Sequence, residues 1–240
     1  KSQKKNLETN ERYRRICKNL TDRKVMVQFA FLMSVTPLFE KFLTMFQSKG
    51  PIVHVILDEC SSLLRTVMGR FLKTDVVRDK TGRRLLEIDC KDAKNQLPDK
   101  SIEIGPTARQ MLSKIPKDQQ HSIMKDITSF YIAITEYLNG HLPLKSELLR
   151  DLLYLHPLLH SQKNGSNVVS RIAQKVPHVV SEQDLTTLKD EWFDYKTSDI
   201  PEDWATEPDG TYKCIDYYCW SKVLDQKTKV DNQGITSYHR

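Results

Sequence analysis

Apolar side chains recur at every third or fourth position in two long stretches of the sequence. The first stretch contains Val53, Ile56, Leu57, Cys60, Leu63, Leu64, Val67 and Phe71. The second contains Ile123, Ile127, Phe130, Ile134, Tyr137 and Leu138. This spacing places the side chains on one face of an α-helix, and that face must pack against another element to leave water. We therefore predict a mainly α fold, a multi-helix domain with irregular connecting loops and at most a short strand or hairpin.

Further helices are expected around these two stripes. Shorter helices are predicted over residues 107–114, 144–155, 168–175 and 182–195, and the stripe of Phe39, Phe42, Leu43 and Phe46 predicts another. At least five helices should form, and the side chains expected to be buried are Leu57, Leu64, Val67, Phe71, Phe130 and Ile134.

Proline and glycine predict where helices break. Pro37 should kink or divide the apolar stretch that begins at Val25, because proline cannot donate the backbone hydrogen bond of an interior helix position. Asn139-Gly140 should end the second stripe. Helical periodicity is absent from residues 75–101, where only residues 84–89 have the composition of a short strand.

The positive charge of the chain is concentrated near its N-terminus. The chain contains 37 Lys and Arg against 31 Asp and Glu, a net charge of +6. Residues 1–24 contain nine basic and three acidic residues, which is the whole excess. Because clustered cations attract phosphate, the candidate nucleic-acid-binding residues are Arg12, Arg14, Arg15, Lys18, Arg23 and Lys24. A solvated basic tail or a nuclear import signal would have the same composition, and both stay open as alternatives.

No arrangement typical of an enzyme occurs in the sequence. The eight glycines are scattered singly, and there is no glycine-rich phosphate loop, nucleophile elbow or His-Glu-x-x-His motif. Asp58 and Glu59 are adjacent, so they would point in different directions on a helix. Glu147 and Asp151 are four residues apart and fit a solvated helix face. We predict no catalytic residue, no metal ligand and no cofactor.

Cysteine usage and hydropathy indicate in which cellular compartment the chain is expected. Five cysteines at irregular spacing are not typical of a disulfide framework, and Cys214 and Cys219 have no second pair at zinc-finger spacing. Reduced cysteines predict the cytosol or the nucleus, and the basic segment favours the nucleus. The longest apolar stretch, residues 25–35, is shorter than the ~18 residues of a membrane span, so no membrane contact is expected.

Aromatic residues gather late in the chain, and all three tryptophans lie between Trp192 and Trp220. A stacking platform for bases needs exposed rings beside Lys or Arg. The neighbouring residues here are mainly acidic, including Asp190, Glu191 and Asp194, and would repel phosphate. Packing between short helices is therefore the favoured interpretation of these rings.

Several patches resemble hAT-type transposase-like proteins. FEKFLTMFQSKGPIVHVILDECSSLLRTVMGRFLK (39–73) and SIEIG (101–105) resemble the helical region of that family. DEWFDYKTSDIPEDW (190–204) and IDYYCWSKVLDQKT (215–228) resemble the acidic and aromatic stretch that precedes its C-terminal dimerisation segment. In active members an RNase H-like core holds three metal-binding carboxylates, and a helical insertion separates the second Asp from the final Glu.

The resemblance implies that the chain corresponds to this insertion and the region just after it. The two catalytic Asp residues would precede Lys1, which is expected to lie inside a longer polypeptide. After Thr228 the sequence has neither the apolar helix nor the Glu-Arg pair that contains the final Glu. The resemblance therefore transfers no catalytic role to any residue, and the protein is not expected to be an enzyme.

We divide the chain into a basic segment (1–24), a helical domain (25–228) and a flexible tail (229–240). Two functions stay open. The chain is either a transposase-derived nuclear module that binds DNA or chromatin, or a helical protein-interaction scaffold with no nucleic-acid role. The expected partners are nucleic acid, through the basic segment, and other protein chains.

Overall fold

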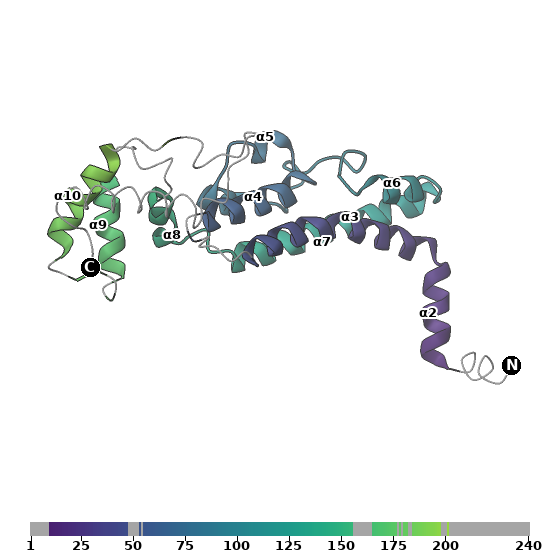
Figure 1. Ribbon diagram of the computed structural model, residues 1–240. Coiled ribbons are helices and arrows are strands. Elements are labelled where there is room, and N and C mark those ends of the chain that lie inside the picture. The colour runs from purple at the N-terminus through teal and green to yellow at the C-terminus, as the bar shows by residue number, and fades with distance from the viewer. Residues whose placement is uncertain are drawn as a thin grey trace. The chain divides into compact units, whose positions relative to one another are not determined.

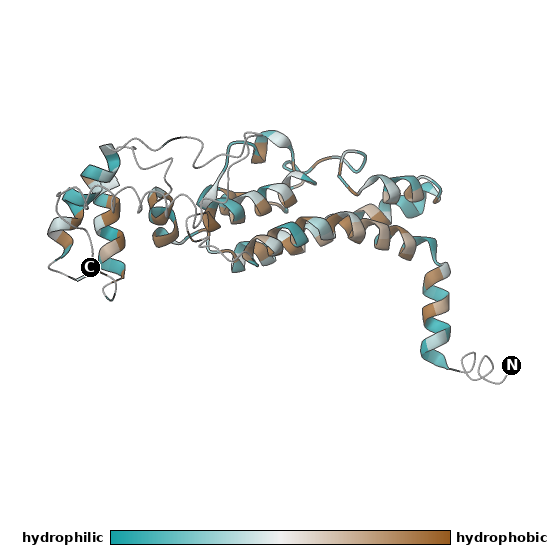
Figure 2. Ribbon diagram, in the orientation of Figure 1, coloured by the Kyte–Doolittle hydropathy of each residue, from teal (hydrophilic) through white to brown (hydrophobic). Residues whose placement is uncertain are grey.

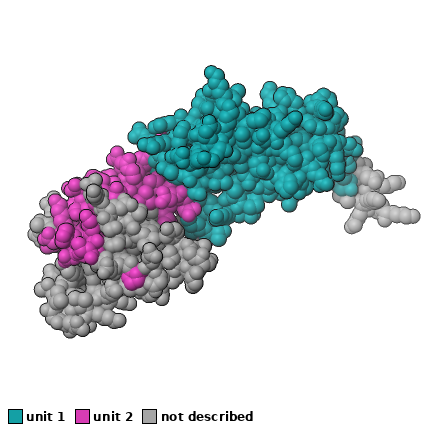
Figure 3. Space-filling view, turned by 90° about the horizontal axis from the view of Figure 1, so that it is seen from above, with its two compact units in different colours: residues 1–45, 60–144 teal, residues 46–59, 145–240 magenta. Residues whose placement is uncertain are grey.

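The computed structural model describes residues 10–47, 53, 55–155, 165–176, 178, 180–181, 184–197 and 201. Helices make up most of this part of the chain, which confirms the mainly α prediction (Figure 1). No strand forms among the described residues, and an isolated antiparallel bridge joins Leu72 to Gln96. The chain divides into two compact units, residues 1–45 with 60–144 and residues 46–59 with 145–240 (Figure 3).

More than five helices form, as predicted. Those before residue 145 are α2 (Glu11–Thr21), α3 (Arg23–Phe46), α4 (Ile56–Gly69), α5 (Thr74–Val77), the 3-10 helix η1 (Gly82–Glu87), α6 (Pro106–Leu112) and α7 (Lys117–His141). Those after it are α8 (Glu147–Leu152), the 3-10 helix η2 (Leu153–Leu155), α9 (Gly165–Lys175) and α10 (Asp184–Thr197). The Gly50-Pro51 helix start, Cys214, Cys219, the aromatic residues after 201 and the tail 229–240 lie outside the described residues.

An aromatic cluster holds α3 and α7 side by side in the first unit (Figure 1). The ring of Phe31 meets Phe130 and Tyr131 edge-on, with centroids 5.3 and 5.2 Å apart. Phe71, just after α4, stacks on Tyr131 at 5.4 Å. Edge-to-face and stacked pairs add to the stabilisation from burial, so Tyr131 lies at the centre of this core.

The stripe of α4 packs as its spacing predicts. Leu57, Leu64, Val67 and Phe71 are all buried, and the last three of these residues have no measurable exposure. Each lies on the same helix face or on the turn that follows it, so the spacing of apolar residues is sufficient here to predict which side chains are buried.

The predicted stripe of α7 is partly wrong. Phe130 and Ile134 are only half-buried, and Tyr137 is exposed. The buried face of α7 comprises Ile123, Met124, Ile127, Tyr131, Thr135 and Leu138. This face is rotated by less than one residue position from the predicted stripe, since Tyr131 and Thr135 are buried where Phe130 and Ile134 were expected to be.

Residues 101–105, with the sequence SIEIG, are hydrogen-bonded to α3 and α7. Ile102 and Ile104 are buried. The Tyr131 hydroxyl donates a hydrogen bond to the backbone oxygen of Glu103 at 2.6 Å, and the Ser34 hydroxyl donates to that of Ile104 at 3.1 Å. These bonds satisfy backbone groups of a segment that belongs to no helix, so the segment has a structural role in this unit.

Three local expectations have different outcomes. Helix α3 continues through Pro37, so the proline does not divide it. Helix α7 ends at His141, one residue after the end expected at Asn139-Gly140. Residues 82–87 form η1, so the stretch 84–89, which has the composition of a short strand, forms no strand. The amide of Gly82 donates to Ser61 Oγ at 3.0 Å, and the side chain of Leu85 is fully buried, so local bonds replace a partner strand.

In the second unit, α9 packs against both α8 and α10. Helix α9 buries Val168, Val169 and Ile172, and α10 buries Trp192 and Tyr195. Burial of Trp192 agrees with the packing interpretation of the late aromatic residues, whereas the neighbouring Phe193 is exposed. The aromatic residues after residue 201 lie outside the described part of the chain.

Candidate functional site

Helix α2 contains most of the predicted nucleic-acid-binding residues. It begins after Asn10, whose side-chain oxygen accepts a hydrogen bond from the Tyr13 amide at 3.2 Å, a standard N-cap. It ends at Asp22, which has extended backbone dihedrals and accepts a bond from the Lys24 amide at 2.8 Å. The carboxylate of Asp22 thus caps the start of α3, and a single non-helical residue separates the two helices.

The sequence of α2 produces two chemically different faces. Successive residues are rotated by about 100°, so Tyr13, Ile16, Cys17 and Leu20 share one side of the helix. We call this side the apolar stripe. The remaining surface of the helix, the basic face, contains Arg15 and Lys18 opposite the stripe and Arg12 and Arg14 on its two flanks, with Glu11 among them. Both kinds of residue are visible on α2 in Figure 2.

Both faces of α2 are exposed, because none of its 11 residues is buried. The basic face runs over seven residues, from Arg12 to Lys18, about 9 Å along the helix axis. Double-stranded DNA has one negative charge per ~1.7 Å, so it presents about five charges over the same length. The four cations are therefore dense enough for several of them to contact phosphate at once.

The structure separates the six predicted residues into two sets. Arg12, Arg14, Arg15 and Lys18 lie on α2, whereas Arg23 and Lys24 lie in the first turn of α3. Within the described residues, the only ion pair formed by this set joins Lys24 Nζ to Asp126 Oδ2 of α7 at 2.8 Å. Lys24 is thus held against the core of the first unit, and Arg23 is exposed.

Helix α3 and helix α6 line a hollow that the sequence analysis missed. Its volume is about 370 Å³, and none of its lining residues is charged. Met26, Phe29, Ala30 and Met33 of α3 form one wall, and residues 105–107 with Met111 form the other. Phe29 is 54% exposed and Met33 is 76% exposed, so this wall faces solvent. We call this feature the α3–α6 groove.

The length and composition of α3 would allow it to cross a membrane, unlike those of the stretch 25–35 considered from the sequence. The apolar stretch is longer than expected because Pro37 does not divide it. The signal for the groove was therefore present in the sequence, as apolar residues on every side of one helix.

The acidic residues weighed as metal ligands in the sequence, for which no metal site is predicted, do not form a cluster in the structure. Asp58 and Glu59 are exposed on α4. In the described part of the chain, no group of three or more His, Cys, Asp or Glu side chains is placed to hold a metal ion. Cys90 is buried, and this burial, with Glu136 nearby, raises the pKa of its thiol, which disfavours the thiolate form.

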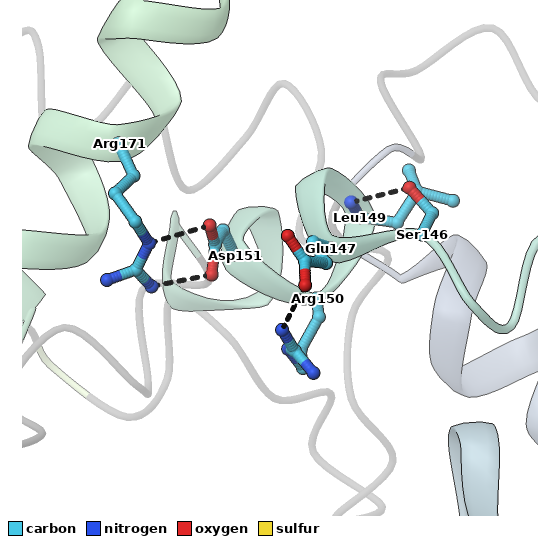
Figure 4. Close-up of polar contacts among 6 residues, drawn as sticks. All are labelled: Ser146, Glu147, Leu149, Arg150, Asp151 and Arg171. Carbon is cyan, nitrogen blue, oxygen red and sulfur yellow. Dashed lines mark hydrogen bonds and ion pairs between the residues drawn. The ribbon is translucent and has the colours of Figure 1, made fainter.

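Asp151 corrects the expectation of a solvated acidic face on α8. Its side chain is 4% exposed, and it accepts two hydrogen bonds from Arg171 of α9, at 2.8 and 3.1 Å (Figure 4). These bonds hold the pKa of Asp151 below its usual value. Glu147, four residues earlier, is exposed and forms only a 3.8 Å contact with Arg150. Sequence spacing could not predict the pair of Asp151 and Arg171, because the two residues lie on different helices.

Comparison of the chain with protein-family models, with curated proteins and with solved structures gives no match. The resemblance to hAT-type transposases therefore rests on the sequence patches alone.

Proposed function

We propose that this chain is a helical binding module that attaches to nucleic acid through the basic face of α2. The observation that supports the proposal is that four cations lie on an exposed helix, all of them outside its apolar stripe. Arg15 and Lys18 can approach a phosphate backbone while the stripe faces away from it, and Arg12 and Arg14 extend the positive surface on either flank. Long cationic side chains that contact phosphates provide affinity without reading bases, so the binding is independent of sequence.

Lys24 and Arg23 have smaller roles in this proposal than the four residues of α2. Lys24 would have to exchange Asp126 for a phosphate, and this exchange reduces its net contribution. Arg23 is exposed and adds to the local positive potential. Origin from a hAT-type transposase, a nuclear location and the lack of enzymatic activity are further parts of the proposal, and they rest on the sequence patterns described above.

The test measures the affinity of the purified chain for duplex DNA as a function of salt concentration. Each phosphate contact contributes about −0.9 to the slope of log K against log salt concentration. The triple variant R12Q/R14Q/R15Q should therefore have a slope about 2.7 less negative than the unchanged chain. Affinity should fall by a similar factor for unrelated DNA sequences.

The matched control is R78Q/R83Q/R84Q, which removes three exposed arginines elsewhere in the first unit. The control changes the net charge by the same amount, so it should leave most of the slope intact. Equal slopes for the two triple variants would show that net charge, and not the α2 face, governs binding. No DNA binding by the unchanged chain at low salt would refute the proposal.

A protein-interaction scaffold is the second candidate function, because a specific observation favours it. The apolar stripe of α2 and the α3–α6 groove are both exposed, and apolar side chains gathered on an exposed surface are typical of interaction sites. The two functions use different faces of α2 and are compatible with each other.

A further inference from the structure

We infer that α2 binds the surface of an acidic lipid bilayer, with Ile16 and Leu20 among the acyl chains and Arg12 and Arg14 at the level of the headgroups. The partner of this side of the helix is thus a membrane surface that contains anionic lipids. The inference goes beyond the proposed function, because a phosphate backbone offers no partner to aliphatic side chains. The expected absence of membrane contact concerned a span, and a helix that lies in the interface does not span the bilayer.

The first argument is the exposure of two large aliphatic side chains on α2. Ile16 is 47% exposed and Leu20 is 57% exposed. They are four residues apart, so they lie one helical turn apart on the same side of the helix. Most other positions of α2 are polar or charged, and none of its residues is buried. A helix of low mean hydropathy with one apolar side is typical of those that lie in a membrane interface.

The second argument is the position of two arginines beside the aliphatic pair. Arg12 lies on one flank of the apolar stripe and Arg14 on the other. An arginine side chain can lay its alkyl stem along apolar surface while its charge stays in a polar layer. Both guanidinium groups can therefore contact lipid phosphates while Ile16 and Leu20 enter the hydrocarbon beneath them.

The third argument is that a bilayer fits this charge arrangement better than a protein groove does. A groove deep enough to cover the stripe would enclose Arg12 and Arg14, and it would need an acidic partner for each of them. An acidic lipid surface supplies negative groups on both sides of the helix at the same depth. Residues 10–24 contain six basic and two acidic residues, so the segment as a whole is attracted to such a surface.

The attachment needs both contributions. A single apolar anchor binds membranes only marginally and reversibly, and stable binding takes a second signal such as a basic patch. Each Lys or Arg close to an acidic membrane contributes about fivefold in affinity. Helix α2 provides an aliphatic pair and flanking cations within 11 residues. We therefore expect binding to acidic vesicles and much weaker binding to neutral ones.

The experiment measures flotation of the complete chain with phosphatidylcholine vesicles, with and without phosphatidylserine, at about 0.1 M salt. I16Q/L20Q should weaken binding to the acidic vesicles by at least about 30-fold, because no aliphatic side chain of the pair remains to enter the hydrocarbon. I16L/L20M, which keeps the apolar area, should stay within about threefold of the unchanged chain. All the substituted residues favour helices, and circular dichroism checks that α2 is retained.

A matched pair of charge variants tests the orientation of the helix. R12Q/R14Q and R15Q/K18Q each remove two positive charges. The first should weaken binding about 25-fold, at about fivefold for each charge. The second removes cations from the far side of α2, about 10 Å from the lipid, where salt screens the membrane potential. It should therefore weaken binding less than about fivefold.

Three results would overturn the inference. One is the absence of flotation with acidic vesicles, which would assign the stripe to a protein partner. Another is undiminished flotation of I16Q/L20Q, and the third is an equal loss from the two charge variants. Either of these would show general attraction of charge without insertion of α2. Duplex DNA binding, measured on the same samples, separates the two proposals, because a chain that binds DNA and not vesicles retains only the proposed function.

Discussion

Helix α2 and helix α4 both repeat apolar residues at the spacing of one helix face, yet their surroundings differ. In α4 that face includes Leu64 and Val67, which have no measurable exposure. In α2 the corresponding face includes Ile16 and Leu20, which are exposed. The comparison teaches that an apolar stripe predicts a surface to be covered but does not specify whether the same chain covers it.

The largest expected effect is on the free energy of unfolding when one leucine in each helix is replaced by alanine. Leu64→Ala should lower the free energy of unfolding by about 3 kcal/mol, because it leaves a cavity where packing is complete. Leu20→Ala, at a site that is 57% exposed, should change it by no more than about 0.5 kcal/mol in the monomer. Denaturation by guanidinium at protein concentrations that keep the chain monomeric measures both. Similar losses for the two variants would mean that α2 is packed within its own chain.

The next prediction extends the comparison to two glycines. Gly105 has φ +82°, and a Cβ there would lie 2.5 Å from Ser34 Cβ. Gly105→Ala should therefore cost about 2 kcal/mol, because alanine rarely adopts this backbone conformation. Gly140 lies in α7 with no atom near its missing Cβ, so Gly140→Ala should stabilise the fold by roughly 0.5 kcal/mol. Thermal unfolding of both variants is the measurement, and shifts of the same sign would contradict the argument.

An effect of similar size is expected from one member of the acidic pair on α8. Asp151→Asn should cost about 2 kcal/mol at pH 7, because the buried side chain loses its charged bonds to Arg171. Glu147→Gln, at an exposed position, should cost less than about 0.5 kcal/mol. Urea denaturation of the two variants tests this difference.

The ion pair of Asp151 and Arg171 predicts that the stability of the fold depends on pH, with a definite sign. The pKa of Asp151 is lower in the folded chain than its ordinary value of 3.8. Its contribution to stability is therefore complete above that ordinary value and is lost as the pH falls through the lowered folded pKa. The difference in free energy of unfolding between the unchanged chain and Asp151→Asn should shrink below about pH 4. A difference that stays constant down to pH 2 would show that the carboxylate charge is not responsible.

Part of the candidate site was predictable from the sequence. The excess of cations before residue 25 identified Arg12, Arg14, Arg15 and Lys18 without any structure. Spacing alone also separates these four residues from the apolar stripe, since rotation per residue is constant in a helix. Spacing could not reveal that Lys24 pairs with Asp126, which is more than 100 residues away in the sequence.

The sequence by itself determined that the chain is mainly helical and which face of α4 is buried, because both depend on local periodicity. Tertiary structure alone decided the buried face of α7, where Tyr131 is accepted into the core because its hydroxyl bonds the backbone of Glu103. It also decided that Asp151 is buried, because Arg171 of another helix meets its charge. The physical reason is common to both cases. In each case a partner distant in sequence replaces the bonds to water that the buried polar group gives up.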